Sequence, residues 1–466
     1  MRKDSSATNS FDVTQCTLVS YVSNATVDIT KLWDSIEIYE DMYTNCLSGQ
    51  IEILDSLNLL YHFSICGREK LILSFSVPVL DGGSGKSSIT RTFRIYKISE
   101  RQPQPNDMGL RYTLHFVSEE FVKSQQTKIS KAFEGTVDQM VKTIYEDYLK
   151  VDYGNSLNQK PLQVDKTLHK HRFVIPYWSP LSAINWLAAR GVSLENRENC
   201  NFVFYEDLQG FQFKSFSNLA IATAEPVAQF EYFSVVRNAE GGQPSVRNLQ
   251  REYETIQDFL MMEYHNTMKN IENGFFSSRL LTHDIVRKKW AFSDYSYGRD
   301  FFSGQDHVHE RPLVAPGNDD LSDKNWSYFK YYPKHTGLMG SESSMQDNDR
   351  YSDWVLKRNA QMQQIEGCQL QISVPGDSTL RIGSVVNIVI PSFEAKDNGY
   401  VDWLDKYMSG KYIVSAIRHR LVSASGYTMR IELTRDSLPS ALPDSKILNI
   451  RDWPSQGDYF TQVVKA

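Results

Sequence analysis

Apolar and polar residues alternate along both ends of the chain with the two-residue period of an extended strand. Near the N-terminus the alternation runs through QIEILDS, EKLILSFSVP, TFRIYKIS and RYTLHFVSEEF. It returns near the C-terminus in QLQISVPG, RIGSVVNIVIPS, KYIVSAIRHRLV and GYTMRIELTRDS. Neighbouring strand segments separated by short turns predict antiparallel sheets. The sequence therefore predicts a β-rich region at each end of the chain.

Between these regions the hydrophobic period becomes helical. The segment KAFEGTVDQMVKTIYEDYLK repeats apolar residues at helical spacing and predicts one helix. A second predicted helix lies in YWSPLSAINWLAARG, with Ser179 as N-cap, Pro180 at the first helical position and Gly191 at the end. The following NFVFYEDLQGFQFKSF predicts a hairpin that turns at Gly210. Residues 122–225 are thus expected to form a small α/β insert.

The two β-rich regions resemble each other. ICGREKLILSFSVP aligns with RIGSVVNIVIPS so that Gly67 matches Gly383, an offset of 383 − 67 = 316. GLRYTLHFVSEEF aligns with SGYTMRIELTRDSL so that Tyr112 matches Tyr427, an offset of 427 − 112 = 315. A nearly constant offset indicates a duplicated β-domain, with the two glycines allowing a kink or bulge where a barrel closes. Chance matching of strand-like segments is the alternative, because two-residue alternation is common.

These patterns predict a β-rich α+β protein with two similar β-barrel domains, an α/β insert and irregular insertions. The expected division is an N-terminal arm at 1–30, a first barrel at 31–121, the insert at 122–225, the start of the second barrel with connecting strands at 226–295, an irregular polar insertion at 296–350, the rest of the second barrel at 351–437, and an extended C-terminal arm at 438–466. The polar insertion is interpreted as a partner-binding arm or a disordered loop.

Composition narrows the classes of function. The 466 residues carry a net charge of −6, so no basic surplus favours tight binding to nucleic acid, and an acidic wall would let DNA slide past. Five widely spaced cysteines without a C-x-x-C pair indicate free thiols in a reducing compartment. The N-terminus lacks a signal-peptide core, and no apolar run approaches the length of a membrane span.

The stretch DGGSGKSS ends like a phosphate-binding loop but lacks its context. Leu80 stands where the motif requires its first glycine, and a predicted strand, not a helix, follows the lysine. A flexible hairpin loop is therefore expected, with Lys86 as a solvated charge. A nucleotide-binding protein remains the remote alternative, and no cofactor is expected.

Other chemistry-bearing residues give weak signals. His307 and His309, like His169 and His171, have the i, i+2 spacing of metal ligands on a strand, but no third ligand follows at a recognised spacing. We interpret the first pair as solvated loop histidines and the second as lying on an exposed edge. There is no G-x-S-x-G serine elbow, and the neighbouring Glu119 and Glu120 are not a catalytic signature.

Six tryptophans leave a second class of function open. Such residues can build a sugar platform, although they are more often core or interface residues. They are Trp178, Trp186, Trp290, Trp326, Trp354 and Trp403. A carbohydrate-binding or carbohydrate-active protein is the alternative that they support.

Three features together resemble the baseplate hub proteins of contractile-tailed, T-even-type bacteriophages. They are LSGQIEILDSLNLL with ICGREKLILSF, then IPYWSPLSAINWLAARG with the NFVFYEDLQGFQF hairpin, and finally RIGSVVNIVIPS with GKYIVSAIRHRLVSASGYTMRIELT. The resemblance runs from about Asp28 to Leu438 and lies in the order and spacing of these segments. The polar segment 296–350 departs from it.

The resemblance implies a structural protein of the virion that is not an enzyme and needs no cofactor or metal. Three chains with two barrels each would form a ring that adapts the sixfold tail tube protein to the threefold central spike protein, beside other baseplate proteins. DNA would contact the ring only in transit through its channel, and no membrane insertion is implied. Assembly would take place in the host cytoplasm, before the ring acts in tail assembly and genome ejection.

Two segments are predicted to contact partners. The loop at 392–411 interrupts the last barrel and carries Tyr400, Trp403 and Tyr407 as anchors for a neighbour. The C-terminal arm carries apolar residues in a polar background, notably Ile447, Leu448 and Trp453. A frayed terminus is the alternative for the arm.

Overall fold

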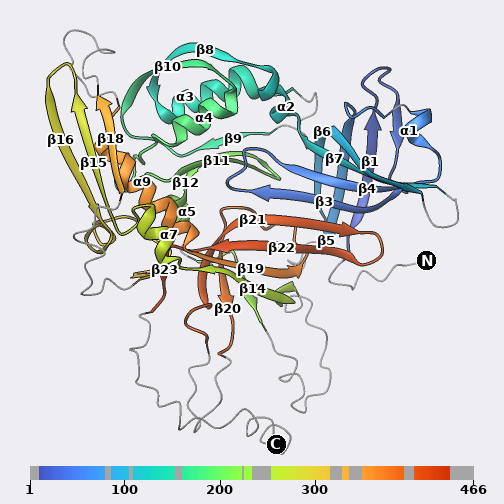
Figure 1. The fold of residues 1–466 in the computed structure, drawn as a ribbon. Helices are drawn as coiled ribbons and strands as arrows, with labels where there is room; N and C mark the ends of the chain where they lie inside the picture. The colour runs from blue at the N-terminus through green and yellow to red at the C-terminus, as the bar shows by residue number, and fades with distance from the viewer. Residues whose placement is uncertain are drawn as a thin grey trace, which may run out of the picture.

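The computed structural model confirms the predicted fold class: 49% of the residues that it describes are in strands and 19% are in helices (Figure 1). It describes residues 10–63, 65–78, 86–103, 109–152, 160–222, 225–232, 253–314, 328–334, 349–392 and 404–440. Among these residues, no helix combines the length and apolar character needed to cross a membrane. All five cysteines are free thiols.

One large sheet runs through both β-rich regions. Its N-terminal strands are β1 (Asp12–Val19), β2 (Thr26–Asp28), β3 (Trp33–Asp41), β4 (Ser48–Asp55), β5 (Lys70–Pro78), β6 (Lys86–Pro103) and β7 (Leu110–Ser118). Its later strands are β13 (Ala228–Glu231), β14 (Asp258–Tyr264), β19 (Cys368–Pro375), β20 (Val385–Val389), β21 (Gly410–Val422) and β22 (Gly426–Thr434). The strand order is β14-β19-β22-β21-β3-β4-β7-β6-β5-β1-β2, and β13 and β20 branch off beside β21.

The two barrels meet where β3 pairs antiparallel with β21. The register runs from Asp41 opposite Ala416 to Ser35 opposite Val422. Figure 1 shows the blue N-terminal strands on one side of this seam and the red C-terminal strands on the other. The second barrel nearly closes on itself, since β13 pairs with β20 and Glu231 bridges to Thr255, just before β14. The seam therefore joins two curved sheets edge to edge.

The alternating sequence pattern is reproduced as alternating burial. Along β3, Ile36 and Ile38 enter the core, while Glu37 and Tyr39 point to the opposite face of the sheet. Along β22, Met429, Ile431 and Leu433 do the same. Burial of each such aliphatic side chain stabilises the fold by about 1.5–3 kcal/mol. The apolar face of the sheet therefore points into the barrels, and the polar face points outward.

The predicted duplication is visible in the strand order. Strands β5, β6 and β7 pair as consecutive antiparallel neighbours, and so do β20, β21 and β22. The matched tyrosines, Tyr112 and Tyr427, are both fully buried. Gly67 and Gly383 have φ values of +85° and +81°, which favour glycine. Both lie in the turn before a strand, so they serve a turn and not the barrel bulge that we expected.

The stretch DGGSGKSS joins two strands, as predicted. β5 and β6 pair antiparallel from Lys70 opposite Arg94 to Pro78 opposite Lys86. Residues 79–85 lie outside the described residues. A strand follows the lysine, so the helix N-terminus that a phosphate-binding loop needs is not formed here.

The α/β insert contains α2 (Glu119–Gln126), β8 (Ile129–Thr136), α3 (Val137–Ile144), the π-helix η1 (Tyr145–Leu149), β9 (Leu162–Val164), β10 (Lys170–Trp178), α4 (Pro180–Ala188), β11 (Phe202–Asp207), β12 (Gly210–Ser215) and α5 (Phe216–Ala222). The second predicted helix and the hairpin are confirmed: the Ser179 side chain caps α4, and Phe204 stacks on Phe211 across the hairpin. The first predicted helix is wrong before residue 137, because β8 pairs with β10 and a capping box at Thr136 starts the helix.

A three-stranded sheet lies at the side of the molecule, at the left of Figure 1. It consists of β15 (Ser277–Asp284), β16 (Lys289–Ser296) and β18 (Tyr328–Lys334), and one face packs on α9 (Tyr351–Glu366). The short elements α1 (Leu59–His62), α7 (Thr267–Glu272), α8 (Tyr297–Asp300), β17 (Arg311–Pro312) and β23 (Ser437–Leu438) complete the described structure. Strand β18 lies inside 296–350, so residues 328–334 belong to a sheet, while residues 315–327 and 335–348 lie outside the described part of the chain.

Candidate assembly surfaces

Charged side chains bridge the two barrels on the outer face of the β3–β21 seam. The Arg418 guanidinium donates to both carboxylate oxygens of Glu37, at 2.6 and 3.1 Å. Tyr39 and Gln50 donate to the same carboxylate, at 2.5 and 3.1 Å. Burial alone would raise the pKa of Glu37, but the hydrogen bonds from Arg418 and Tyr39 outweigh it and hold the pKa below its usual value. A bidentate pair with two further donors fixes the geometry of the seam.

The polar face continues on both sides of the seam. On the first barrel, Arg111 of β7 pairs with Glu52 of β4 and lies 3.2 Å from Asp34. On the second barrel, Ser415 donates to Glu432 of β22, and the exposed Arg430 lies opposite Arg418 in register. Acidic and basic side chains therefore face each other between β3 and β21 and between β4 and β7, whereas the two arginines Arg418 and Arg430 lie opposite each other on β21 and β22.

The inner face of the same seam holds a buried polar group of three side chains. His419 lies 2.8 Å from a carboxylate oxygen of Glu40 through Nε2 and 2.8 Å from the Tyr427 hydroxyl through Nδ1. Burial raises the pKa of Glu40 against the opposing effect of His419. Tyr427 is one of the duplicated tyrosines, so the core of the second barrel is tied to β3 of the first.

Replacing Arg418 with alanine is expected to lower the free energy of unfolding by about 1–2 kcal/mol. Glu37 is buried and would lose its bidentate partner, but Arg418 is partly exposed, so solvent screens the pair. Urea denaturation followed by circular dichroism measures the change. The matched control is Arg430→Ala on the adjacent strand. An equal loss of stability in both variants would show that the Glu37–Arg418 pair contributes no more than an ordinary surface arginine.

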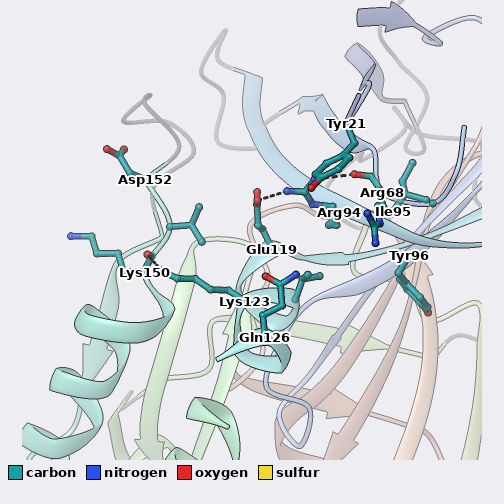
Figure 2. Close-up of a pocket in the computed structure, with 13 residues that line it drawn as sticks. Tyr21, Arg68, Arg94, Ile95, Tyr96, Glu119, Lys123, Gln126, Lys150 and Asp152 are labelled. Atoms are coloured by element: carbon teal, nitrogen blue, oxygen red, sulfur yellow. Dashed lines mark hydrogen bonds and ion pairs between the residues drawn. The ribbon is translucent and has the colours of Figure 1, made fainter. Parts of the chain in front are cut away.

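A cleft of about 580 Å³ separates the first barrel from the insert (Figure 2). Arg94 and Glu119 form an ion pair at 2.5 Å across it, and Lys123 donates to the Lys150 carbonyl at 2.7 Å. Arg68 lies 5.5 Å from the centre of the Tyr21 ring. Each of these cations thus already contacts a carboxylate, a carbonyl or an aromatic ring, and the described lining contains no nucleophile with an adjacent base.

A buried charge cluster fastens the insert to the first barrel. The Lys160 ammonium lies 2.6 Å from Glu120 and 2.6 Å from Glu206, and all three side chains are at most 1% exposed. The second oxygen of Glu206 accepts from the Leu47 backbone N–H at 2.9 Å. Burial and the neighbouring Glu206 raise the pKa of Glu120, although Lys160 opposes this. A single cation between two carboxylates therefore holds the junction.

Replacing Lys160 with methionine is expected to destabilise the chain by about 3–5 kcal/mol, because two buried carboxylates would lose their counter-ion. Urea denaturation of the full chain measures this loss. Lys142→Met removes an exposed ion pair with Glu146 and should change stability by less than about 0.5 kcal/mol. The two variants should differ clearly; similar small losses would mean that Glu120 and Glu206 become neutral without Lys160.

We expected His307 and His309 to be solvated loop residues. Instead, they contact the chain at the end of β22, and we call this pair the histidine clasp. His307 Nδ1 lies 2.8 Å from a carboxylate oxygen of Asp436, and the Val308 N–H donates to the other oxygen at 3.1 Å. His309 Nε2 accepts from the Lys411 N–H at 3.0 Å. Nearby, the buried Arg435 donates to the carbonyls of Ser409 and Tyr407. The polar segment is anchored on the second barrel here.

The two histidines respond to pH in opposite directions. Burial alone would lower the pKa of His307, but the Asp436 carboxylate outweighs it and raises the pKa above the usual value. Burial and the Arg435 charge lower the pKa of His309 to about 4. Stability from neutral His309 is therefore complete above the unfolded pKa of about 6.5 and is lost as the pH falls towards 4. Stability from His307 is complete below about 6.5 and is lost above its folded pKa.

His309→Gln should flatten the loss of stability between pH 6.5 and pH 4, by up to about 3 kcal/mol. Glutamine has no charged form, so the penalty for protonating a buried imidazole disappears. Thermal unfolding at half-unit pH steps measures the slope. The control is the exposed His62→Gln, and an unchanged slope in His309→Gln would contradict the assignment.

We expected His169 and His171 to lie on an exposed edge, but the structure does not place them there. His171 is buried on β10 and stacks on Phe173 with ring centres 5.1 Å apart, while His169 lies 3.7 Å from Asp353. Among the described residues, no group of three or more histidine, cysteine, aspartate or glutamate side chains is arranged to hold a metal ion.

The predicted partner anchors are only partly covered by the structure. Tyr407 is exposed, and its ring stands edge-on to Tyr264 at the end of β14, with centres 5.8 Å apart. Tyr400, Trp403, Ile447, Leu448 and Trp453 lie outside the described residues. Their contacts with partners stay predictions.

The tryptophans do not gather into one platform where they are described. Trp178 and Trp186 pack edge-on to each other against the core of the insert, and Trp354 is a buried residue of α9. Trp290 is exposed on the separate three-stranded sheet. Trp326 and Trp403 lie outside the described residues.

The seam residues were missed by the sequence analysis. Glu37 and Arg418 stand 381 positions apart, and each reads locally as the polar position of an amphipathic strand. Lys160 and Arg435 likewise occupy segments that look exposed. No local signal distinguishes these charges from ordinary surface residues.

Comparison with known proteins identifies the relatives of this fold. No family model matches the chain. A curated relative, "Probable baseplate hub protein gp334" of Vibrio phage KVP40, is 21% identical over 418 residues, which cover 86% of this chain and 89% of that protein. The chain is a relative of a phage baseplate hub protein. The family resemblance that the sequence motifs suggested is thereby confirmed.

One solved structure supports the same fold. The 43 kDa tail protein of prophage MuSo2 from Shewanella oneidensis superposes with a TM-score of 0.50 at 10% identity, covering 92% of this chain and all of that protein. A tail protein from Neisseria meningitidis gives a TM-score of 0.49 at 11% identity, covering 91% of this chain and 96% of that one.

Proposed function

We propose that this chain is the structural hub of a contractile phage tail baseplate, where three copies form a ring between the sixfold tail tube and the threefold central spike. The relative in phage KVP40 is named a baseplate hub protein, and its match extends over most of both chains. The observation that carries the ring is the pair of similar barrels joined at β3 and β21. Three such pairs supply six similar units, which meet sixfold symmetry on one face and threefold symmetry on the other.

The polar face of the joined sheet is proposed to line the channel for DNA. It crosses the seam without interruption, and its charged groups pair with one another, as Arg418 does with Glu37 and Arg111 with Glu52. A surface of paired charges presents little net field to a passing polyanion, so DNA is not held. The function is mechanical and requires no catalysis or cofactor.

Contacts between copies are proposed at the open edge of the second barrel. Strand β14 ends the strand order there and exposes Leu260 and Met262, and Tyr407 packs beside its last residue. An edge strand offers unpaired backbone groups to a neighbouring chain. The same proposal gives partner contacts to Tyr400, Trp403, Ile447, Leu448 and Trp453.

The sequence-based division into an arm, two barrels, an insert, a polar insertion and a C-terminal arm remains part of this proposal. So do the location in the tail baseplate, the assembly in the host cytoplasm, and the association with the tube, the spike and other baseplate proteins.

Light scattering of the purified chain tests the ring. A trimer has a mass of 3 × 53.6 = 160.8 kDa, and electron microscopy of that fraction should show threefold particles with a central channel. The result expected is the trimer, alone or after addition of the spike protein. A chain that stays at 53.6 kDa in the presence of the spike protein would rule out the ring.

A further inference from the structure

The outer face of the β15-β16-β18 sheet forms a regular grid. Its three rungs, read in the order β16, β15, β18, are Asp294, Arg279, Phe329; Phe292, Leu281, Tyr331; and Trp290, His283, Pro333. The inner face is covered, since Leu280, Tyr295 and Tyr332 pack with Trp354 of α9. The sheet is therefore held rigidly from behind while its outer face remains open to solvent.

The outer face is aromatic and exposed. Trp290, Phe292, Phe329 and Tyr331 retain 58%, 60%, 53% and 48% of their surface. Monomeric proteins seldom expose a contiguous group of large apolar side chains unless it binds something. We name these nine grid residues the outer aromatic face.

The side chains of this face are already ordered by one another. The His283 ring stacks on Trp290 with centres 3.9 Å apart and an interplanar angle of 3°. His283 Nδ1 lies 3.2 Å from the Tyr331 hydroxyl, and the Arg279 guanidinium lies 5.5 Å from the centre of the Phe292 ring. Preorganised aromatic side chains lose little conformational entropy when they bind a partner.

The size of the face selects the kind of partner. Three strands span about 15 Å, and the three rungs with their side chains extend about 20 Å, which gives roughly 300 Å². A stable contact between folded subunits buries about 800 Å² on each partner. The face is too small for a permanent contact with a second copy. It fits one segment, of about 6 residues if extended or about 13 if helical.

Charge gives the segment a direction. The turn between β15 and β16 carries Arg287 and Lys288, Lys289 begins β16, and Lys334 ends β18 at the same end of the sheet. The acidic side chain at this end is the buried Asp284, the last residue of β15. At the opposite end, Arg279 and Asp294 form a bidentate pair at 2.6 and 2.7 Å and neutralise each other. One end of the grid is basic and the other is neutral.

We propose that the outer aromatic face docks a single segment of another protein, with apolar side chains on the aromatic rungs and carboxylates beside the basic turn. Apolar burial supplies most of the affinity, and the basic turn sets the orientation and the rate of encounter. The docking rests on the proposed function only for where the partner is sought, namely among the proteins of a phage tail.

Photo-cross-linking of the full chain in infected cells tests this docking. The photoreactive amino acid p-benzoylphenylalanine replaces Phe292, and the exposed Leu57 of the first barrel carries it in the control. We expect Phe292 to cross-link to one short segment of a second protein that contains apolar residues and aspartate or glutamate, and Leu57 not to reach that segment. Cross-links only to further copies of this chain, only to lipid or glycan, or to nothing would overturn the proposal.

Cross-linking in the cell tests the docking and does not depend on whether the chain forms a ring. Light scattering tests the ring on purified protein. One proposal can therefore be contradicted while the other is supported. Mass spectrometry of purified tails then shows whether the chain is in the particle, which tests the hub role and not the docking.

The captured segment, made as a synthetic peptide, tests the chemistry. Its Kd for the full chain, measured by fluorescence anisotropy, should rise at least tenfold in Trp290→Ser/Phe292→Ser and about fivefold in Lys288→Glu/Lys289→Glu. High salt screens charge, so it should reduce the effect of the lysine substitutions on the Kd. It should leave the effect of the Trp290 and Phe292 substitutions unchanged. Leu57→Ser is the matched control, and thermal unfolding verifies that each variant is folded. Charge reversal without effect on the Kd would overturn the acidic character of the segment.

Discussion

The pairing of β3 with β21 is the constraint on which the rest of the structure depends. It brings residues near the two ends of the chain into one ladder, from Ser35 opposite Val422 to Asp41 opposite Ala416. Both sides of this ladder are reinforced, by Glu37 with Arg418 outside and by Glu40 with His419 inside. Closing so long a loop carries an entropic cost, which the contacts of the seam offset while they hold both barrels together.

Buried charges join the remaining parts to this frame. Lys160 fastens the insert to the first barrel, and Asp436 with His307 fastens the segment before β17 to the second. A buried ion pair adds little net stability over apolar packing, but breaking one is costly. Such contacts therefore specify one arrangement of the parts. A rigid arrangement is what the proposed ring would require.

Much of the fold followed from the sequence because it depends on local periodicity. The strands of both barrels, the cap of α4 by Ser179 and the Phe204–Phe211 hairpin were all predicted from spacing and turn residues. The false helical assignment of residues 131–136 shows the limit. Phe133 fits a helical spacing with Val137 as well as it fits a strand, and the pairing of β8 with β10 decided between the two. The seam, the Lys160 cluster and the histidine clasp join distant residues, so no local pattern could reveal them.

Strand β21 has 13 residues and pairs with β3, β20 and β22. After a duplication, two domains usually drift apart, each tolerating its own insertions. Here one strand serves both copies, and a single inserted residue in it would turn its side chains to the opposite face in both barrels. Both barrels therefore constrain the length of β21. Insertions are tolerated in the connections between strands, where the α/β insert and the β15-β16-β18 sheet lie.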